Sequence, residues 1–387
     1  MLADLLDSLL GTTLFEYISV RVALAAFTAF AVALLIGGRT IRWLKSLRVD
    51  DNVETSGSAD LADTSKKSGK DRTPSMGGSF LIASLLFAVL AWADVTRPLV
   101  MFGVILCAGL GAVGFLDDYT KLTRPKSGGM SRRAKWIGLS LVCLFVILAA
   151  VQNARQTGRG AITSLYPPFF KDVVISPLEW AGIWGALGFV AFVFFEWLVL
   201  VGTANAANIT DGLDGLAAGC VLISGLALTI FCYVTGRADW TGYLDLPYVP
   251  AASDMAVFGG ALCGACMGFL WFNAHPAKVF MGDSGSLPLG GVLAWMAFVS
   301  KQELVLPLIA CVLVIDAGSS WLQTFYFRRT GGKRIFTMAP IHHGLQLYGG
   351  VFTKRPDARW HEVTVVIRFW IVAAVGAIAS LALLKIR

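Results

Sequence analysis

Long apolar segments alternate with short polar ones along nearly the whole chain. A membrane-spanning helix needs about 17 to 25 mainly apolar residues, and most of the apolar segments reach this length. The pattern predicts an all-α integral membrane protein with about ten transmembrane helices, forming a single polytopic domain over residues 1–387. The predicted spans are Ile18 to Gly38, Gly77 to Ala93, Pro98 to Leu116, Trp136 to Val151, Trp180 to Gly202, Leu216 to Val234, Met255 to Phe272, Ser286 to Val299, Leu304 to Phe327 and Val363 to Leu384.

The composition agrees with a membrane protein and excludes an ordinary soluble domain. Of the 387 residues, 56% are hydrophobic and 15% are charged, and the mean hydropathy is +0.69. Soluble domains carry about a quarter charged residues. Two predicted spans, 136–151 and 286–299, are short for a bilayer, so the number of spans depends on whether these two cross completely.

Basic residues gather in alternate loops. If the first span ends inside the cell, the inside loops hold 22 of the 32 Lys and Arg residues and the outside loops and tails hold eight. Cytoplasmic loops are enriched in Lys and Arg, so both termini are predicted to be periplasmic. The net charge of +7 follows from this topology and does not indicate nucleic-acid binding. The predicted inside loops are Arg39 to Met76, Asp117 to Lys135, Thr203 to Gly215, Asn273 to Gly285 and Arg328 to Glu362.

The N-terminal segment, Met1 to Tyr17, carries three acids, and no cation precedes Arg21. This is the reverse of the basic start of a signal peptide, so the first span is expected to be retained. The loop from Val49 to Lys70 is rich in Asp, Ser, Lys and Gly and is predicted to be mobile. Its continuation, Thr73 to Gly78, contains a proline and a glycine pair, which suits close approach of backbone to a ligand.

Two adjacent carboxylates, Asp117 and Asp118, follow the third span directly, and Lys121 comes shortly after. Ionised acids are costly in hydrocarbon, so the pair must lie where the helix meets water, beside cations or a metal. The alternative is an ordinary helix end, since charges gather at membrane boundaries. Further acids on the same side of the membrane would favour a functional site.

A second polar cluster, from Asn205 to Gly215, lies in a predicted inside loop and contains Asn208, Asp211 and Asp214 but no Lys or Arg. If the sixth helix begins here, the two acids are three residues apart and face the same side of its first turn. A capped Asp-Gly turn is the alternative. The number of amides and carboxylates favours a site.

A third cluster, from Phe280 to Ser286, contains a Gly-Asp-Ser-Gly sequence. Its backbone N–H groups could face an anion, and Asp283 offers a hard oxygen ligand for a divalent cation. The same four residues surround the nucleophilic serine of trypsin-like proteases, but no β-barrel pattern accompanies them here. We therefore expect a metal or anion site rather than a serine hydrolase.

The last inside loop contains His342 and His343 after four basic residues. A zinc site is the alternative, but zinc would need three or four nitrogen or sulfur ligands, and no cysteine lies near. Carboxylates with water suit Mg²⁺ better, and Mg²⁺ commonly bridges to substrate phosphates. The histidines and nearby lysines would then bind phosphate oxygens.

All of these clusters fall on the predicted cytoplasmic face. Acids and cations together at a membrane surface indicate metal-assisted chemistry on a phosphorylated compound, with a lipid in the bilayer as one partner. No Rossmann or P-loop pattern accompanies them. The residues gathered there are Asp117, Asp118, Asp211, Asp214 and Asp283, with Lys70, Lys121, Lys135, His342 and His343.

These motifs resemble those of the polyprenyl-phosphate N-acetylhexosamine-1-phosphate transferase superfamily, within the glycosyltransferase 4 family. The likeness extends from Lys70 to Trp370, with the motifs in the same order and spacing. The histidine motif and Val366 to Trp370 are similar to the muramoyl branch rather than to branches that use other sugars. The matching segments are Thr73 to Gly78, Gly114 to Lys121, Asn208 to Gly215, Phe272 to Gly291 and Ala339 to His343.

The resemblance implies transfer of phospho-MurNAc-pentapeptide from UDP-MurNAc-pentapeptide to undecaprenyl phosphate, with Mg²⁺ as cofactor and lipid I and UMP as products. It also implies a multi-pass protein of the bacterial cytoplasmic (inner) membrane that serves peptidoglycan synthesis. A homodimer is a further expectation from the family.

By the same resemblance, the catalytic residues are Asp283, which would bind the metal, and Asp117, which would deprotonate or orient the lipid phosphate with Asp118 beside it. Phe280 would stack on the uridine base. The other implied uridine-side contacts are Lys70 and Asp211, and Thr73 is a further substrate contact. The residues that would hold the diphosphate and the metal are Lys121, Lys135, Asn208, Asp214, His342 and His343.

Five positions depart from the family's pattern. Gly344 stands in place of a third histidine, and Gln346 in place of an acid that usually follows it. Arg72, Ser75 and Leu139 replace residues that are usually glycine, threonine and glutamine. Roles tied to positions 344 and 346 therefore do not carry over, but no implied metal ligand is lost.

Two other functions remain open at this point. A sibling transferase would move the phosphate of another UDP-sugar, such as UDP-GlcNAc. An ion-coupled transporter would place acids near the middle of its spans. Glu196 is the only obvious carboxylate that the sequence predicts in the middle of a span, which disfavours a transporter. The residues also leave open whether attack is direct or passes through an aspartyl-phosphate.

Overall fold

A computed structural model of the chain describes residues 2–46, 73–123, 129–170 and 173–385. Within these residues the fold is helical and contains no strand, apart from an isolated bridge between Leu165 and Ile175. Short 3-10 turns connect some of the helices. The α-helices are α1 (Leu2–Leu10), α2 (Ile18–Ser46), α4 (Gly78–Trp92), α5 (Pro98–Thr123), α6 (Arg132–Thr157), α7 (Ile183–Thr210), α8 (Leu216–Thr235), α9 (Ala238–Leu244), α10 (Ala252–Asn273), α11 (Asp283–Ser300), α12 (Leu306–Ile309), α13 (Cys311–Arg329), α14 (Ile341–Tyr348) and α15 (Glu362–Ala382).

The predicted all-α membrane fold is confirmed. Among the described residues, seven helices are long and apolar enough to cross a membrane, namely α2, α5, α6, α7, α8, α10 and α15. The remaining predicted spans are also helical, as α4, as α11 and as the α12–α13 pair. The chain is therefore a multi-pass membrane protein.

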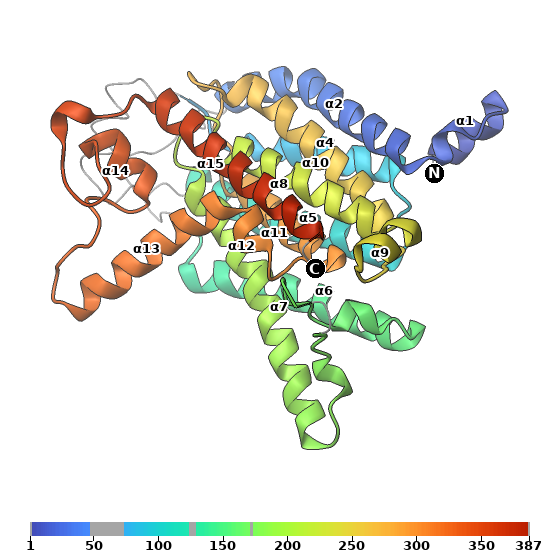
Figure 1. Cartoon of the computed structure of the whole chain (residues 1–387). Coiled ribbons are helices and arrows are strands. Elements are labelled where there is room, and N and C mark those ends of the chain that lie inside the picture. Colours follow the sequence, from blue (N-terminus) through green and yellow to red (C-terminus); the bar gives the residue numbers. More distant parts are fainter. Residues whose placement is uncertain (1, 47–72, 124–128, 171–172, 386–387) are drawn as a thin grey trace.

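Helix α11 lies at the centre of the molecule, and all of its residues are buried. It packs against α4, α5, α7 and α8, while α10 packs against α2, α4 and α8 (Figure 1). A helix that is apolar all round belongs inside a bundle. Because α11 begins at Asp283, the centre of the bundle carries that acid at its N-terminal end.

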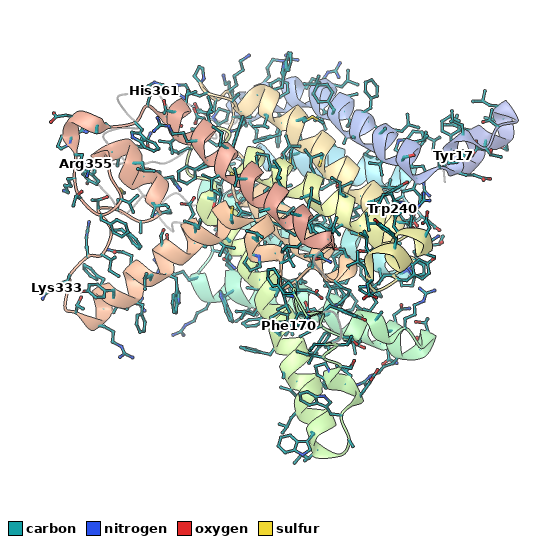
Figure 2. All side chains as sticks on the ribbon, in the orientation of Figure 1. Tyr17, Phe170, Trp240, Lys333, Arg355 and His361 are labelled. Carbon is teal, nitrogen blue, oxygen red and sulfur yellow. The ribbon has the colours of Figure 1, made fainter. Side chains whose placement is uncertain are left out.

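One predicted inside loop and two predicted outside segments lie at different ends of the molecule. Figure 2 shows Lys333, Arg355 and His361, which all belong to the last predicted inside loop, at the end that carries α13 and α14. Tyr17 and Trp240, which belong to predicted outside segments, lie at the other end, with α1 and α9.

The predicted span Leu304 to Phe327 is interrupted. The helix stops at Ala310, whose φ of −108° and ψ of 38° are not helical, and α13 then leaves the bundle in a different direction (Figure 1). A carbonyl freed in a buried break needs a donor, and the Ser224 hydroxyl donates to the carbonyl of Ile309 over 3.0 Å. The span is thus a short helix followed by a longer projecting one.

Several helices extend beyond their apolar segments. Helix α5 continues to Thr123 and α7 to Thr210, so the polar residues at these ends are helical rather than in loops. Helix α8 begins only at Leu216. The expectation that Asp211 and Asp214 share the first turn of the sixth helix is therefore wrong, because both lie in the turn before it.

Candidate active site

Glycines let α4, α5 and α11 approach one another at the site. A Cβ added to Gly114 of α5 would overlap the backbone carbonyl of Asp283, and one added to Gly78 of α4 would overlap the backbone of Gly285. Only glycine permits such backbone contact. The contact brings the polar end of α5 directly against the start of α11.

Three predicted carboxylates meet at this contact. Asp117, Asp118 and Asp283 are all buried, and each offers a carboxylate oxygen that lies within 4.8 Å of the others. Asp283 is more than 160 positions away from the adjacent Asp117 and Asp118 in the sequence, but the three acids form one group in space. Carboxylate oxygens are the ligands that hard divalent cations take, so the group could hold a metal ion.

Two lysines offset part of the negative charge of this group. The Nζ atoms of Lys121 and Lys135 lie 2.9 Å and 2.6 Å from Oδ2 of Asp283, and Lys121 also lies 2.9 Å from Oδ2 of Asp117. Burial alone would raise the pKa of Asp283, but a hydrogen bond with Asp117 and the charges of Lys135 and Lys121 hold that pKa below its ordinary value. Asp283 is therefore kept as an anion.

Asp118 caps the N-terminus of α11. Its two carboxylate oxygens accept the backbone N–H groups of Asp283 over 3.2 Å and of Ser284 over 2.9 Å. The first N–H groups of a helix have no partner within the helix, and an acid there also interacts favourably with the helix dipole. Gly282, with φ of 72°, leaves room for the carboxylate.

Asp117 faces a different element. Its Oδ1 accepts the backbone N–H of Met130 over 2.7 Å, and its Oδ2 points to Lys121 and Lys135. Gly129, with φ of 97°, packs against the same carboxylate. The segment before α6 is thereby tied to the end of α5.

Asn208 connects the end of α7 to the carboxylates. Its amide nitrogen donates to Oδ1 of Asp283 and, over 2.9 Å, to the hydroxyl of Ser286. Ser286 is a contact that the sequence did not single out, because a serine beside a Gly-Asp-Ser-Gly motif carries no signal of its own.

The histidine pair forms a second cluster. A Cβ added to Gly212 would lie 2.5 Å from Nε2 of His342 and 3.0 Å from Nε2 of His343, so the Asp211–Gly212 turn adjoins both rings. Nδ1 of His342 lies 2.8 Å from Oδ2 of Asp316, which is fully buried in α13. The structure thus brings the predicted histidines to the predicted turn.

Asp316 is a second carboxylate inside a predicted span. Glu196 is not the only carboxylate inside a predicted span, because Asp316 lies in the middle of the apolar segment from Leu304 to Phe327. An ionisable residue within a span indicates function by default. That signal could have identified Asp316 from the sequence.

Asp214 belongs to a third group. Its Oδ2 lies 2.9 Å from Nδ1 of His275 and accepts the backbone N–H of Ala277 over 3.1 Å, while its own N–H donates to Glu362. The Asp214 carboxylate thus holds the connection between α10 and α11, and its implied role toward diphosphate and metal stays a prediction. His275 and Glu362, which the sequence analysis did not single out, complete this group.

The remaining predicted residues lie around these groups. Phe280 is half-buried, and its backbone pairs with Pro74 and Gly77 over 2.8 Å each. The Thr73 hydroxyl lies 3.5 Å from the carbonyl of Ala277, close to the Asp214 anchor. Lys70 and Arg72, with the loop predicted to be mobile, lie outside the described residues.

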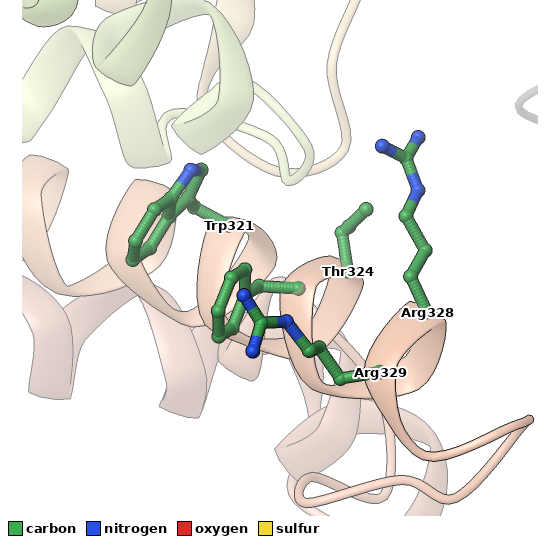
Figure 3. Close-up of a pocket in the computed structure, with 5 residues that line it drawn as sticks. Trp321, Thr324, Arg328 and Arg329 are labelled. Atoms are coloured by element: carbon green, nitrogen blue, oxygen red, sulfur yellow. The ribbon is translucent and has the colours of Figure 1, made fainter.

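A surface hollow also lies along α13 (Figure 3). The rings of Trp321 and Phe325 stack there with centroids 5.7 Å apart, and Arg329 lies over Phe325. Thr324 and Arg328 complete the lining. None of the predicted site residues lines it, so the hollow is distinct from the three groups described above.

Comparisons with known proteins show the family of this chain. The family model described as glycosyl transferase family 4 matches residues 99–301. A phospho-N-acetylmuramoyl-pentapeptide-transferase of Thermodesulfovibrio yellowstonii is 40% identical over 100% of this chain and 99% of its own length. Proteins of the same name from Neisseria gonorrhoeae and Oleidesulfovibrio alaskensis are each 39% identical, over 100% and 96% of this chain and 99% and 95% of their own lengths. The chain therefore belongs to glycosyl transferase family 4 and, within it, to the group whose curated members are named phospho-N-acetylmuramoyl-pentapeptide-transferase.

Proposed function

We propose that this protein transfers phospho-MurNAc-pentapeptide from UDP-MurNAc-pentapeptide to undecaprenyl phosphate, forming lipid I and releasing UMP. The observation that carries the proposal is the group of Asp117, Asp118 and Asp283 with two lysines, located at the end of membrane helices. Phosphoryl transfer needs charge neutralisation and in-line positioning more than a strong base, and this group offers both signs of charge. The names of relatives at 39% to 40% identity give the transferred group, phospho-N-acetylmuramoyl-pentapeptide, and the family resemblance implies the UDP donor and the lipid acceptor.

Asp117 is the proposed contact of the lipid phosphate. An oxygen of that phosphate forms a bond to the sugar-bearing phosphorus of the UDP-sugar, and the bond from this phosphorus to the oxygen of UMP breaks. Asp117 would accept the proton of the lipid phosphate or orient its oxygen. Its backbone contact at Met130 fixes the carboxylate for either role.

Asp283 is the proposed Mg²⁺ ligand, and the donor set fits this ion because its neighbours are carboxylates rather than sulfur. Bound Mg²⁺ would neutralise charge on the diphosphate. Lys121 and Lys135 already lie against Asp283 and are placed to turn to phosphate oxygens. Asn208 would keep Asp283 oriented.

The uridine side is proposed to lie beside the turn after α7. Phe280 would stack on the base, and Asp211, Lys70 and Thr73 would contact the nucleoside. His342 and His343 would hold the diphosphate. Asp214 would contribute by holding the segment between α10 and α11, which leads to Phe280 and Asp283, through its hydrogen bond with the N–H of Ala277.

The membrane arrangement is part of the proposal. Ten spans in one domain, with both termini in the periplasm, would place the carboxylates on the cytoplasmic side of the bacterial inner membrane. The basic loop with Lys333 and Arg355 lies away from Tyr17 and Trp240 (Figure 2), which supports this orientation. A homodimer is a family expectation within the same proposal.

The test is release of UMP by the purified full-length protein in detergent, supplied with Mg²⁺, undecaprenyl phosphate and UDP-MurNAc-pentapeptide. We expect release that depends on both substrates and is lost in Asp283→Ala. Absence of UMP release by the wild-type protein, or full release by that variant, would contradict the proposal. UDP-GlcNAc serves as the competing donor, and turnover of UDP-GlcNAc alone would assign the protein to the sibling reaction.

A further inference from the structure

His342 and Asp316 form a buried pair beside the candidate site. His342 lies in the first turn of α14, and Asp316 lies within α13. Nδ1 of the histidine is 2.8 Å from Oδ2 of the aspartate, and neither side chain is exposed. A carboxylate bound to one nitrogen of an imidazole fixes the ring's orientation and the placement of its protons.

The other nitrogen of His342, Nε2, is unpaired within the part of the chain that the structure describes. Among the described residues, Nε2 is buried but makes no hydrogen bond. Buried polar atoms are normally paired, so an unpaired one requires an explanation. Nε2 faces Gly212, where an added Cβ would lie only 2.5 Å away, so this nitrogen is aimed at the turn that follows α7.

We propose that Asp316 is a positioning residue, which holds Nδ1 of His342 so that Nε2 presents an N–H to an anionic oxygen of the UDP-linked substrate beside Gly212. The identity of this ligand rests on the proposed function. An imidazole that carries protons on both nitrogens can donate one hydrogen bond to the Asp316 carboxylate and the other to a phosphate oxygen.

The placement of charge around the ring suits this role. Asp316 lies on the Nδ1 side, away from Gly212, so its negative charge orients the ring without facing the substrate. Two further titratable groups in this region are His343, whose ring centroid lies 4.2 Å from that of His342, and Asp211, next to Gly212. Asp316 is the residue that hydrogen-bonds to Nδ1 of the His342 ring.

A double-mutant cycle tests whether Asp316 acts through His342. We expect Asp316→Asn to lower kcat/KM for UDP-MurNAc-pentapeptide about 10-fold or more, mainly through KM, as loss of an orienting partner does elsewhere. Asp316→Glu, which keeps the carboxylate, should retain more activity. The double variant with His342→Gln should be no worse than His342→Gln alone.

The matched control is Ser319→Ala. Ser319 is buried in the same helix, and its hydroxyl donates to the carbonyl of Asp316 without contacting His342. This variant should keep full activity. Losses that multiply in the double variant, or an Asp316→Asn variant with wild-type kinetics, would overturn the proposal.

Nitrogen-15 spectra of histidine-labelled protein give a readout that does not depend on turnover. The chain has four histidines, which single substitutions can assign. We expect Asp316→Asn to shift the Nδ1 signal of His342 and leave His275 unchanged, and UMP with Mg²⁺ to shift Nε2 in the wild type only. An unchanged Nδ1 signal would refute the pairing. If the wild type releases no UMP but Nδ1 shifts, the proposed function fails and the pairing stands.

Discussion

Asp117 and Asp118 are neighbours in the sequence, but their carboxylates serve different elements. Asp118 accepts two backbone N–H groups at the start of α11, whereas Asp117 accepts the N–H of Met130 and faces Lys121. Successive residues on a helix point about 100° apart, so one acid turns toward the buried helix and the other toward the lysines. The two acids should therefore fail in different ways when changed.

Asp117→Asn should lose activity without losing structure. The asparagine oxygen can still accept the N–H of Met130, but the side chain can no longer take a proton or carry charge. We expect the rate of UMP release to fall about 100-fold or more, the range lost with a group that transfers protons. A melting temperature close to that of the wild type is the control, and a variant with the full transfer rate would remove Asp117 from the mechanism.

Asp118→Ala should mainly lower stability. It leaves the N–H groups of Asp283 and Ser284 without an acceptor, and an unpaired buried donor costs about 1–3 kcal/mol. Asp118→Asn keeps one acceptor oxygen and should lose less. Thermal unfolding in detergent measures the difference, and equal melting temperatures for wild type and Asp118→Ala would show that the cap contributes nothing.

Gly114→Ala should disrupt the contact between α5 and α11. The new methyl group would overlap the carbonyl of Asp283, and overpacking of this kind costs about 1–3 kcal/mol. Gly111→Ala is the matched control, because its nearest neighbour would be Ile82 at 3.7 Å, an ordinary contact. We expect Gly114→Ala to lower both the melting temperature and UMP release, and Gly111→Ala to lower neither. Similar behaviour of the two variants would argue against the close approach.

Mg²⁺ should stabilise the protein through Asp283. A ligand that binds only the folded state adds about 2.7 kcal/mol when its concentration is 100 times its dissociation constant. The melting temperature in the presence of EDTA should therefore rise when excess Mg²⁺ is added to the wild type but not to Asp283→Asn. Asp239→Asn, which alters an exposed acid of α9, should respond like the wild type. An equal rise in Asp283→Asn would place the metal elsewhere.

The helices could be predicted from apolarity, but their ends could not. Apolar residues mark the part of a helix in contact with lipid or core, whereas the backbone stays helical for as long as its hydrogen bonds continue. Helix α5 therefore runs past Leu116 through its acids to Thr123. The break at Ala310 was not predicted, because a continuous apolar segment does not show where the helix axis changes direction.

The candidate site was predictable where a motif contributes its own side chains. Asp117 and Asp283 were singled out from the sequence, and the structure brings them together. Partners supplied by tertiary packing were missed, such as Asp316 for His342 and His275 for Asp214. Each of these pairs joins separate elements, and nothing in the local pattern of either residue specifies the other.

The end of α7 and the turn that follows it contact all three groups within a few residues. Asn208 binds Asp283, Gly212 adjoins the histidine pair, and Asp214 anchors the connection before α11. Because one short segment contacts all three groups, a movement of this segment at one group would also change its contacts with the others, and such coupling is reciprocal. A compound that bound between Gly212 and His342 and displaced this segment would therefore also move Asn208 relative to Asp283.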